Sequence, residues 1–245
     1  MNVDVLIVGA GPTGLALAVQ LRRWGVSFRV VEALADRRRE SRALAVHART
    51  LELLDTIGCA DQLVALGRRP RAVQVHVSEP PLEVPVGRVE AAGTRFPFVL
   101  MVSQAETEAV LAAWLGAQGV TVERAVTASI DAVEAERVRC RLTHAGDGAV
   151  SLTARYVVGC DGAHSMVRHT AGIAFEGDAY PQRFLLADLE VDGLDTEVAH
   201  AFPGADAALL ALPLGTPRTW RVIGIDGAGG EGEVPAESPL TLDEV

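Results

Sequence analysis

The sequence DVLIVGAGPTGLALA at residues 4–18 predicts a strand, a tight turn and a helix. The apolar run at 5–8 is typical of a parallel strand that is covered on both faces. The turn has the spacing G-x-G-x-x-G at Gly9, Gly11 and Gly14. In such turns the first glycine permits the sharp bend, the second lets the backbone approach a pyrophosphate, and the third lets the helix pack close to the strand. The helix N-terminus then offers N–H groups to the phosphates.

The second apolar run, at 28–31, strengthens the interpretation of the glycine turn. It ends in Glu32, at about the 20-residue separation where an acidic side chain accepts hydrogen bonds from an adenosine ribose. The alternative is that Glu32 only caps the next turn. Its place at the end of a second apolar strand makes that alternative less favoured, so we expect a dinucleotide site at this edge of the sheet.

Composition narrows the classes of function. The 245 residues suffice for one large or two small domains, and the formal net charge of −10 argues against nucleic acid as a partner. All 22 basic residues are arginine, which excludes Schiff-base chemistry on lysine and a Walker-type phosphate loop.

Three cysteines, Cys59, Cys140 and Cys160, lie far apart and without metal-ligand spacing. We interpret them as free thiols in a reducing compartment and expect no metal site. The sequence shows neither a signal-peptide pattern nor 18 consecutive apolar residues, so we expect a cytoplasmic location and no membrane partner.

Further along the chain, the pattern changes from helical to strand-rich. The arginine-rich residues 36–42 are typical of a solvated loop, although their place beside the expected pyrophosphate would also suit phosphate contacts. Helices are predicted over 44–57 and after Ser103, an expected N-cap with Glu106 three residues on. Alternating and apolar runs predict the strands and hairpins at 73–97, 121–126, 129–133, 137–143, 152–158, 185–191, 198–202, 208–212 and 220–225.

The second informative turn is at 159–162 (GCDG), after a predicted apolar strand. Asp161 would stand at the carboxyl end of a parallel strand, where doubly wound sheets bind ligands. An equally weighted alternative is that Asp161 caps the helix that follows.

Three blocks together resemble one family. They are the glycine turn with Glu32, residues 41–52 (SRALAVHARTLE) and residues 159–168 (GCDGAHSMVR). The chain is thereby similar to the N-terminal portion of class A FAD-dependent aromatic monooxygenases, the para-hydroxybenzoate hydroxylase and phenol hydroxylase superfamily. Within it, the greatest similarity is to hydroxylases that tailor aromatic polyketides in antibiotic biosynthesis.

The resemblance implies cofactor roles for individual residues. The glycine turn and Glu32 would hold the ADP half of FAD, Asp161 would contact FAD and NAD(P)H, and Val126 would meet the adenine. Arg42 and Gln104 would lie near the flavin. The full implied FAD-binding set is Gly9, Gly11, Pro12, Thr13, Gly14, Glu32, Ala33, Arg42, Gln104, Val126 and Asp161.

No catalytic residue is predicted, because in this family the flavin carries the difficult step. The family reduces its flavin with NAD(P)H, and O2 then forms a flavin hydroperoxide that hydroxylates an aromatic, polyketide-like or phenolic molecule. Epoxidation and Baeyer–Villiger oxidation on the same scaffold stay open. His47 could act as a base on a phenol, but a surface helix histidine is the favoured interpretation. Tyr180 is a weak candidate for substrate contact.

The implied fold is α/β, with a FAD-binding, Rossmann-like parallel sheet and an interleaved antiparallel β substrate domain. We expect the FAD-binding domain at 1–70 and 98–175, and the substrate-binding sheet at 71–97 and 176–235. A simple NAD-dependent dehydrogenase is disfavoured, because the chain leaves the βαβ rhythm for antiparallel hairpins.

One departure from the family concerns its third motif, a Gly-Asp-Ala-x-His segment that supports the flavin ring, which the 245 residues do not contain. Residues 236–245 are expected to start a truncated helix. The alternative function is therefore a truncated or split FAD-binding module, inactive until a second polypeptide supplies the C-terminal part.

Overall fold

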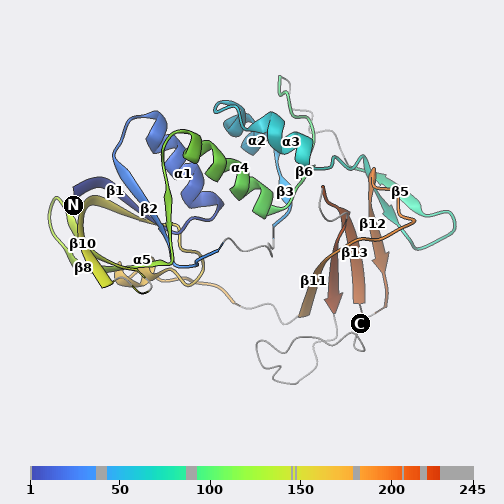
Figure 1. The fold of residues 1–245 in the computed structure, drawn as a ribbon. Helices are drawn as coiled ribbons and strands as arrows, with labels where there is room; N and C mark the ends of the chain where they lie inside the picture. The colour runs from blue at the N-terminus through green and yellow to red at the C-terminus, as the bar shows by residue number, and fades with distance from the viewer. Residues whose placement is uncertain are drawn as a thin grey trace.

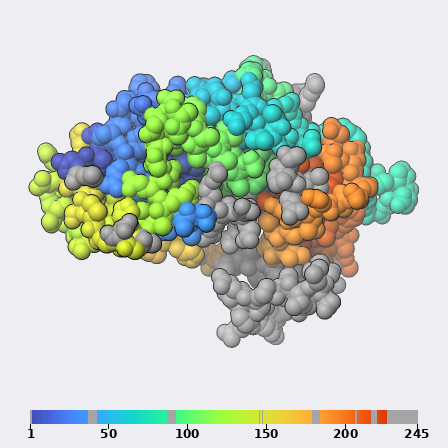
Figure 2. All heavy atoms as spheres, in the orientation of Figure 1, coloured from blue at the N-terminus to red at the C-terminus, as the bar shows by residue number. Residues whose placement is uncertain are grey.

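Two six-stranded sheets make up the framework of the molecule (Figure 1). The computed structural model describes residues 2–36, 43–86, 93–144, 146, 148–178, 183–205, 207–215 and 220–226. Figure 2 shows the strands that form the second sheet gathered at the end of the molecule opposite the first.

The first sheet, sheet A, has the order β7-β2-β1-β10-β9-β8. Strands β7, β2, β1 and β10 run parallel, and β9 and β8 continue the sheet with antiparallel pairing. The parallel part puts the ends of β1, β2 and β10 at one edge, as the sequence predicted. The bounds are Asn2–Val8 (β1), Phe28–Glu32 (β2), Val122–Arg124 (β7), Val126–Val133 (β8), Val138–His144 (β9) and Gly148–Gly159 (β10).

Successive side chains of a strand point to opposite faces, so the apolar strands of sheet A present two apolar faces. Helices pack on both of them. On one face Val5, Ile7 and Val30 pack with four helices, and on the other Leu6 and Val31 pack with a short fifth helix (Figure 1). The first group is α1 (Pro12–Arg23), α2 (Ala48–Asp55), α3 (Ala60–Leu66) and α4 (Gln104–Ala117), and the fifth helix is α5 (Met166–Thr170).

The predicted helix over 44–57 begins later than expected. Ala45–Val46 forms a short strand, β3, which pairs with β6 at Leu100–Met101, and α2 starts only after His47. The pairing with β6 places Ala45 and Val46 in extended backbone, and His47 is still extended at φ −82° and ψ 159°. Helix α3 was not predicted from the sequence.

The second sheet, sheet C, has the order β11-β14-β13-β12-β4-β5. It combines the early hairpin, which ends at Pro85, with the four late strands, which begin at Arg183. Its pairing is antiparallel, as expected, except between β12 and β4, which run parallel. The bounds are Ala72–Val75 (β4), Leu82–Pro85 (β5), Arg183–Leu189 (β11), Val198–Pro203 (β12), Ala207–Pro213 (β13) and Trp220–Asp226 (β14).

The predicted α/β class, with a parallel sheet and a separate, largely antiparallel one, is confirmed. Within the described part of the chain, no helix combines the length and apolarity needed to cross a bilayer. Arg42, Tyr180 and the expected helix at 236–245 lie outside the described residues.

Candidate functional site

Two turns meet at the carboxyl edge of sheet A. The Cys160 N–H donates to the Val8 carbonyl at 2.7 Å, and the Gly9 N–H donates to the Val31 carbonyl at 2.8 Å. These bonds extend the pairing of β10 with β1 and of β1 with β2 into the turns. The glycine turn and the Asp161 turn, which are some 150 residues apart in sequence, therefore lie against each other.

The three motif glycines differ in what surrounds them. A Cβ added at Gly9, where φ is +100°, would lie 2.3 Å from the Cys160 carbonyl oxygen. A Cβ at Gly14 would lie 2.0 Å from the Gly9 carbonyl oxygen. A Cβ at Gly11 would meet nothing within 4 Å. Packing of the protein itself thus requires glycine at the first and third positions, whereas the second opens onto free space.

That space lies at the N-terminus of α1. Gly11 is the N-cap residue, Pro12 is the first helical residue, and no side chain caps the helix. The first-turn N–H groups of a helix have no intrahelical acceptor, and the helix dipole adds positive charge there. An open, uncapped helix start with no Cβ in front of it has the form and charge that a pyrophosphate requires.

Both carboxylate oxygens of Glu32 accept hydrogen bonds from backbone N–H groups at this edge of the sheet. Oε2 accepts the Ala10 N–H at 2.9 Å, and Oε1 accepts the Leu34 N–H at 3.0 Å. The side chain therefore does cap the next turn, and it also fixes the glycine turn. A carboxylate has about four acceptor positions, so these two bonds leave acceptor capacity for ribose hydroxyls. Ala33 lies exposed between the two anchored segments.

Strand β7 brings Val126 close to Glu32. Glu32 pairs with Arg124, and the Ala125 N–H donates to the Leu34 carbonyl at 3.2 Å. Ala125 has a φ of +55°, so the chain bends there before Val126 opens β8 as a buried residue. The bend puts the Val126 backbone beside the loop that Glu32 anchors.

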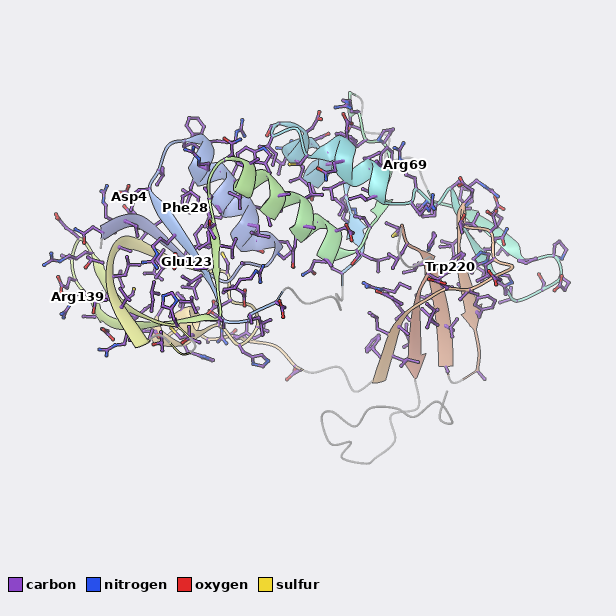
Figure 3. All side chains as sticks on the ribbon, in the orientation of Figure 1. Asp4, Phe28, Arg69, Glu123, Arg139 and Trp220 are labelled. Atoms are coloured by element: carbon purple, nitrogen blue, oxygen red, sulfur yellow. The ribbon has the colours of Figure 1, made fainter. Side chains whose placement is uncertain are left out.

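Beneath this bend, β2 and β7 are joined by an ion pair. The Arg29 Nε donates to Glu123 Oε1 at 2.6 Å, and Figure 3 labels Glu123. The pair is largely buried, with about a fifth to a quarter of each side chain exposed. It joins β2 to β7 at the outer edge of sheet A.

The Asp161 carboxylate is engaged by the helix that follows it. Oδ1 accepts the Ser165 hydroxyl at 2.6 Å, and Oδ2 accepts the N–H groups of Met166 at 2.7 Å and Val167 at 3.3 Å. These contacts are the ones expected if Asp161 caps the helix that follows it. Asp161 builds the turn whose backbone abuts Gly9, and burial together with the Asp161 charge raises the pKa of the neighbouring Cys160 thiol.

Gln104 lies away from the glycine turn, at the start of α4. Its backbone N–H donates to the Ala43 carbonyl at 3.3 Å, and its side-chain amide donates to Glu108 Oε1 at 2.8 Å. Ser103 is the N-cap, as predicted, and its hydroxyl accepts the Ala105 N–H. Ala43 directly follows Arg42 in sequence, so the structure brings Gln104 to the end of the arginine-rich segment. His47 is an exposed residue at the N-cap of α2, as a surface histidine would be.

One partly buried ion pair near Gln104 was not predicted from the sequence. Arg221 on β14 has no exposed surface, and its guanidinium contacts Asp188 on β11 through two bonds. A charged residue between two apolar ones in each of two predicted strands was the available signal.

Comparisons with known proteins show which family shares this arrangement. The model of the family described as FAD binding domain matches residues 2–217. The 6-methylpretetramide 4-monooxygenase of Streptomyces rimosus is 37% identical over 236 residues, which cover 95% of this chain and 41% of that protein.

Solved structures of flavoprotein hydroxylases have a similar fold. The anhydrotetracycline hydroxylase OxyS from Streptomyces rimosus superimposes with a TM-score of 0.72 at 31% identity, covering 92% of this chain and 45% of its own. Aklavinone-11 hydroxylase, solved with FAD and aklavinone, gives a TM-score of 0.79 at 25% identity, covering 95% and 47%. The chain thus spans less than half the length of these relatives.

Proposed function

Because the chain belongs to the FAD-binding domain family, whose members include polyketide-tailoring monooxygenases, we propose that it forms the cofactor-binding part of a flavoprotein hydroxylase. The substrate would be an aromatic molecule of polyketide-like or phenolic type, with O2 and NAD(P)H as co-substrates. The family resemblance seen in the sequence is confirmed, and FAD is the family's cofactor. The reaction, the substrate and a cytoplasmic location are parts of the proposal.

The observation that carries the proposal is the open position at Gly11. Two glycines of the turn are needed by the fold itself, whereas a Cβ at Gly11 would clash with no atom of the protein. A glycine there gives the protein only a small N-cap preference, so its main use is to leave room for a bound group. The uncapped start of α1 indicates that this group is anionic.

Each described residue at the edge has a role in this proposal. The N–H groups of Thr13 and Gly14 would bind the pyrophosphate, and the Glu32 carboxylate would accept ribose hydroxyls. The backbone at Val126 would border the adenine. Bound FAD would supply the redox chemistry, accepting electrons from NAD(P)H and activating O2 for transfer of one oxygen atom.

The flavin half of the cofactor would extend from α1 toward Gln104 and Arg42. Gln104 is held by its bonds to Ala43 and Glu108, so its position does not depend on the cofactor. Sheet C would provide a wall for the substrate and exclude water from the reacting atoms. The domain division proposed from the sequence, with 1–70 and 98–175 against 71–97 and 176–235, is retained here as part of the proposal.

The second candidate is a split or truncated module that binds FAD but is inactive without a C-terminal part on a second polypeptide. Two observations favour it. The relatives are more than twice as long as the matched part of this chain. Large apolar side chains are exposed after α5 and on β11, including Phe175 at 70% and Phe184 at 61%. Surface of this kind marks a contact site for another segment or chain.

One experiment separates the two candidates. The purified chain is titrated with FAD while flavin fluorescence is recorded, and then supplied with NADPH, O2 and a panel of phenols and aromatic polyketides. Binding near one equivalent with oxygenated product by mass spectrometry supports the hydroxylase. Binding without product supports the split module, and absence of FAD binding contradicts both.

A further inference from the structure

Two histidines of sheet C form a hydrogen-bonded pair outside the cofactor edge described above. His76 follows the last residue of β4, and His200 lies on β12 with 3% of its surface exposed. His76 Nε2 and His200 Nδ1 are 3.0 Å apart. The other ring nitrogen of His200, Nε2, lies 3.2 Å from the Asp195 carbonyl oxygen. Because a carbonyl oxygen only accepts hydrogen bonds, His200 Nε2 carries a proton.

The bond between the two rings limits how many protons the pair can hold. When both rings are neutral, His76 Nε2 donates to His200 Nδ1, and after one proton is added a charged His200 donates to a neutral His76. After two protons are added, every ring nitrogen is a donor, so the bond is lost and two like charges face each other across 3.0 Å. The closed pair therefore accepts one extra proton, whereas the separated rings accept two.

The surroundings hold both rings in place. Phe202 stacks on His76 with ring centroids 4.2 Å apart and planes 14° apart, and Trp220, labelled in Figure 3, packs on His200 with centroids 5.4 Å apart. The Asp195 carbonyl also accepts the Val198 N–H at 3.3 Å, which fixes its direction. Neither imidazole can turn away from the other without disturbing this packing.

The pair stands at the joint between the early hairpin and the late strands. Strands β4 and β12 run parallel over four residue pairs, from Ala72 with Val198 to Val75 with Ala201. The joint ends at His76, whose N–H donates to the Ala201 carbonyl at 2.9 Å. A parallel pairing this short has few backbone bonds, so a side-chain bond at its end adds substantially to what holds the hairpin.

The charged groups near the pair have other partners or lie in exposed turns. Arg71 pairs with Glu83 at 2.5 Å and with Asp195 at 3.6 Å. Strands β13 and β14 present Ala211 and Trp220 to His200, and neither ionises. Among the described residues, neither imidazole is bonded to a charged side chain, so each ring responds mainly to the charge of the other. The charged residues on the elements around the pair are Arg71, Glu79, Glu83, Asp195 and Glu197.

We propose that His76 and His200 form a proton-controlled latch that holds the β4–β5 hairpin on sheet C, closed with at most one added proton and open with two. The latch is a property of sheet C and does not depend on FAD. Because the open state binds more protons, a fall in pH favours opening, and the opening equilibrium constant rises by at most about tenfold per pH unit. Acidification would thus loosen the hairpin and leave the cofactor edge of sheet A unchanged.

Nuclear magnetic resonance of the full 245-residue chain can follow both the protons and the opening. Imidazole nitrogen shifts report which ring nitrogens are protonated, and exchange of the His76 amide reports opening, because its bond to Ala201 exists only in the closed sheet. After correction for intrinsic exchange, we expect the protection of this amide to fall about tenfold between about pH 6.5 and 5. The Cys160 amide, which donates to Val8 in sheet A, should keep its protection.

Two substitutions of His76 distinguish a latch from a merely structural contact. In His76→Gln the side-chain amide can donate to or accept from His200, so the protection of residue 76 should no longer depend on pH. In His76→Phe the rings cannot bond at any pH, so the protection should be low and equally flat. His169→Gln removes an exposed histidine of α5, outside sheet C, and as the matched control it should keep the wild-type pH dependence.

Three results would overturn the latch. One is a protection of the His76 amide that stays constant in wild type between about pH 7.5 and 5. Another is the same pH dependence in His76→Gln as in wild type. The third is full protonation of both imidazoles with undiminished protection, since the closed pair cannot hold two added protons. FAD binding enters none of these measurements, so failure of the latch is distinguishable from failure of the proposed function.

Discussion

The cofactor edge of sheet A and the buried face of sheet C are built in different ways. At the edge, the contacts run largely between backbone groups within short turns, such as Gly9 to Val31 and Cys160 to Val8. In sheet C, by contrast, a side chain reaches outside the sheet: Arg221 pairs with Asp188 on the neighbouring strand and also donates to the Ala43 carbonyl. A site made of turns is recognisable from spacing, whereas a site made of one long-range pair is recognisable only in three dimensions.

A similar contrast exists inside the glycine turn. Gly14 is required by the close approach of the Gly9 carbonyl, and Gly11 faces open space. One motif therefore contains a position that the fold requires and a position that, in the proposed function, leaves room for the cofactor. Substitution at each position should separate these two purposes.

Gly14→Ala should have the largest effect on stability. The new Cβ would lie 2.0 Å from a backbone oxygen, and neither that oxygen nor the helix can move without breaking the pairing of β1 with its neighbours. We expect a loss of about 3 kcal/mol in the free energy of unfolding, measured by urea denaturation.

The matched control is Gly116→Ala in α4, where a Cβ would meet nothing within 4 Å. There the better helix propensity of alanine should raise stability by up to about 1 kcal/mol. Equal stabilities for the two variants would show that the turn relaxes, and the distinction drawn between Gly14 and Gly11 would be lost.

Glu32→Gln should have an intermediate effect. The carboxylate accepts from two backbone N–H groups, whereas an amide presents an NH2 group toward one of them. We expect unfolding to become easier by about 1 kcal/mol, and the ADP Kd to rise. Gln74, a partly buried polar residue on β4, changed to Ala provides a comparison in sheet C, where ADP affinity should not change. An unaltered ADP Kd for Glu32→Gln would remove Glu32 from the ribose site.

The Cys160 thiol gives the smallest effect, a difference in chemical reactivity. Burial, and secondarily the nearby Asp161 charge, raise the pKa of the thiol. Alkylating reagents attack the thiolate, so at pH 8 Cys160 should react more slowly than an unhindered cysteine, and its rate should rise with pH beyond the point where a free thiol levels off. Mass spectrometry of iodoacetamide-treated protein measures this. Rapid modification at pH 7 would contradict the buried environment between the two turns.

Much of the architecture followed from sequence patterns. The strands at 28–32, 198–203 and 220–226 lie within a residue or two of their predicted bounds, because alternation and apolar runs are local signals. The helix over 44–57 was predicted too long, because pairing of Ala45–Val46 with a strand 55 residues later outweighed helix periodicity. The parallel pairing of β12 with β4 likewise depends on a partner that periodicity cannot identify.

The candidate site could likewise be predicted only in part. The glycine turn, Glu32 and Asp161 were found from spacing, and the structure brings them together at one edge. That Asp161 acts mainly by capping α5 could not be decided from sequence, because its acceptors face N–H groups of a helix whose start was uncertain. Arg221 and Asp188 were missed because strand register, rather than separation in sequence, makes them partners.

FAD binding by the Gly11→Ala variant tests the central claim most directly. The account predicts that the variant keeps its free energy of unfolding within about 1 kcal/mol of wild type, since the Cβ meets no protein atom and only the N-cap preference changes. It predicts that FAD affinity falls by at least about tenfold, because the Cβ occupies the place of the pyrophosphate. A stable variant that binds FAD as tightly as wild type would show that the open space before α1 is not where the cofactor binds.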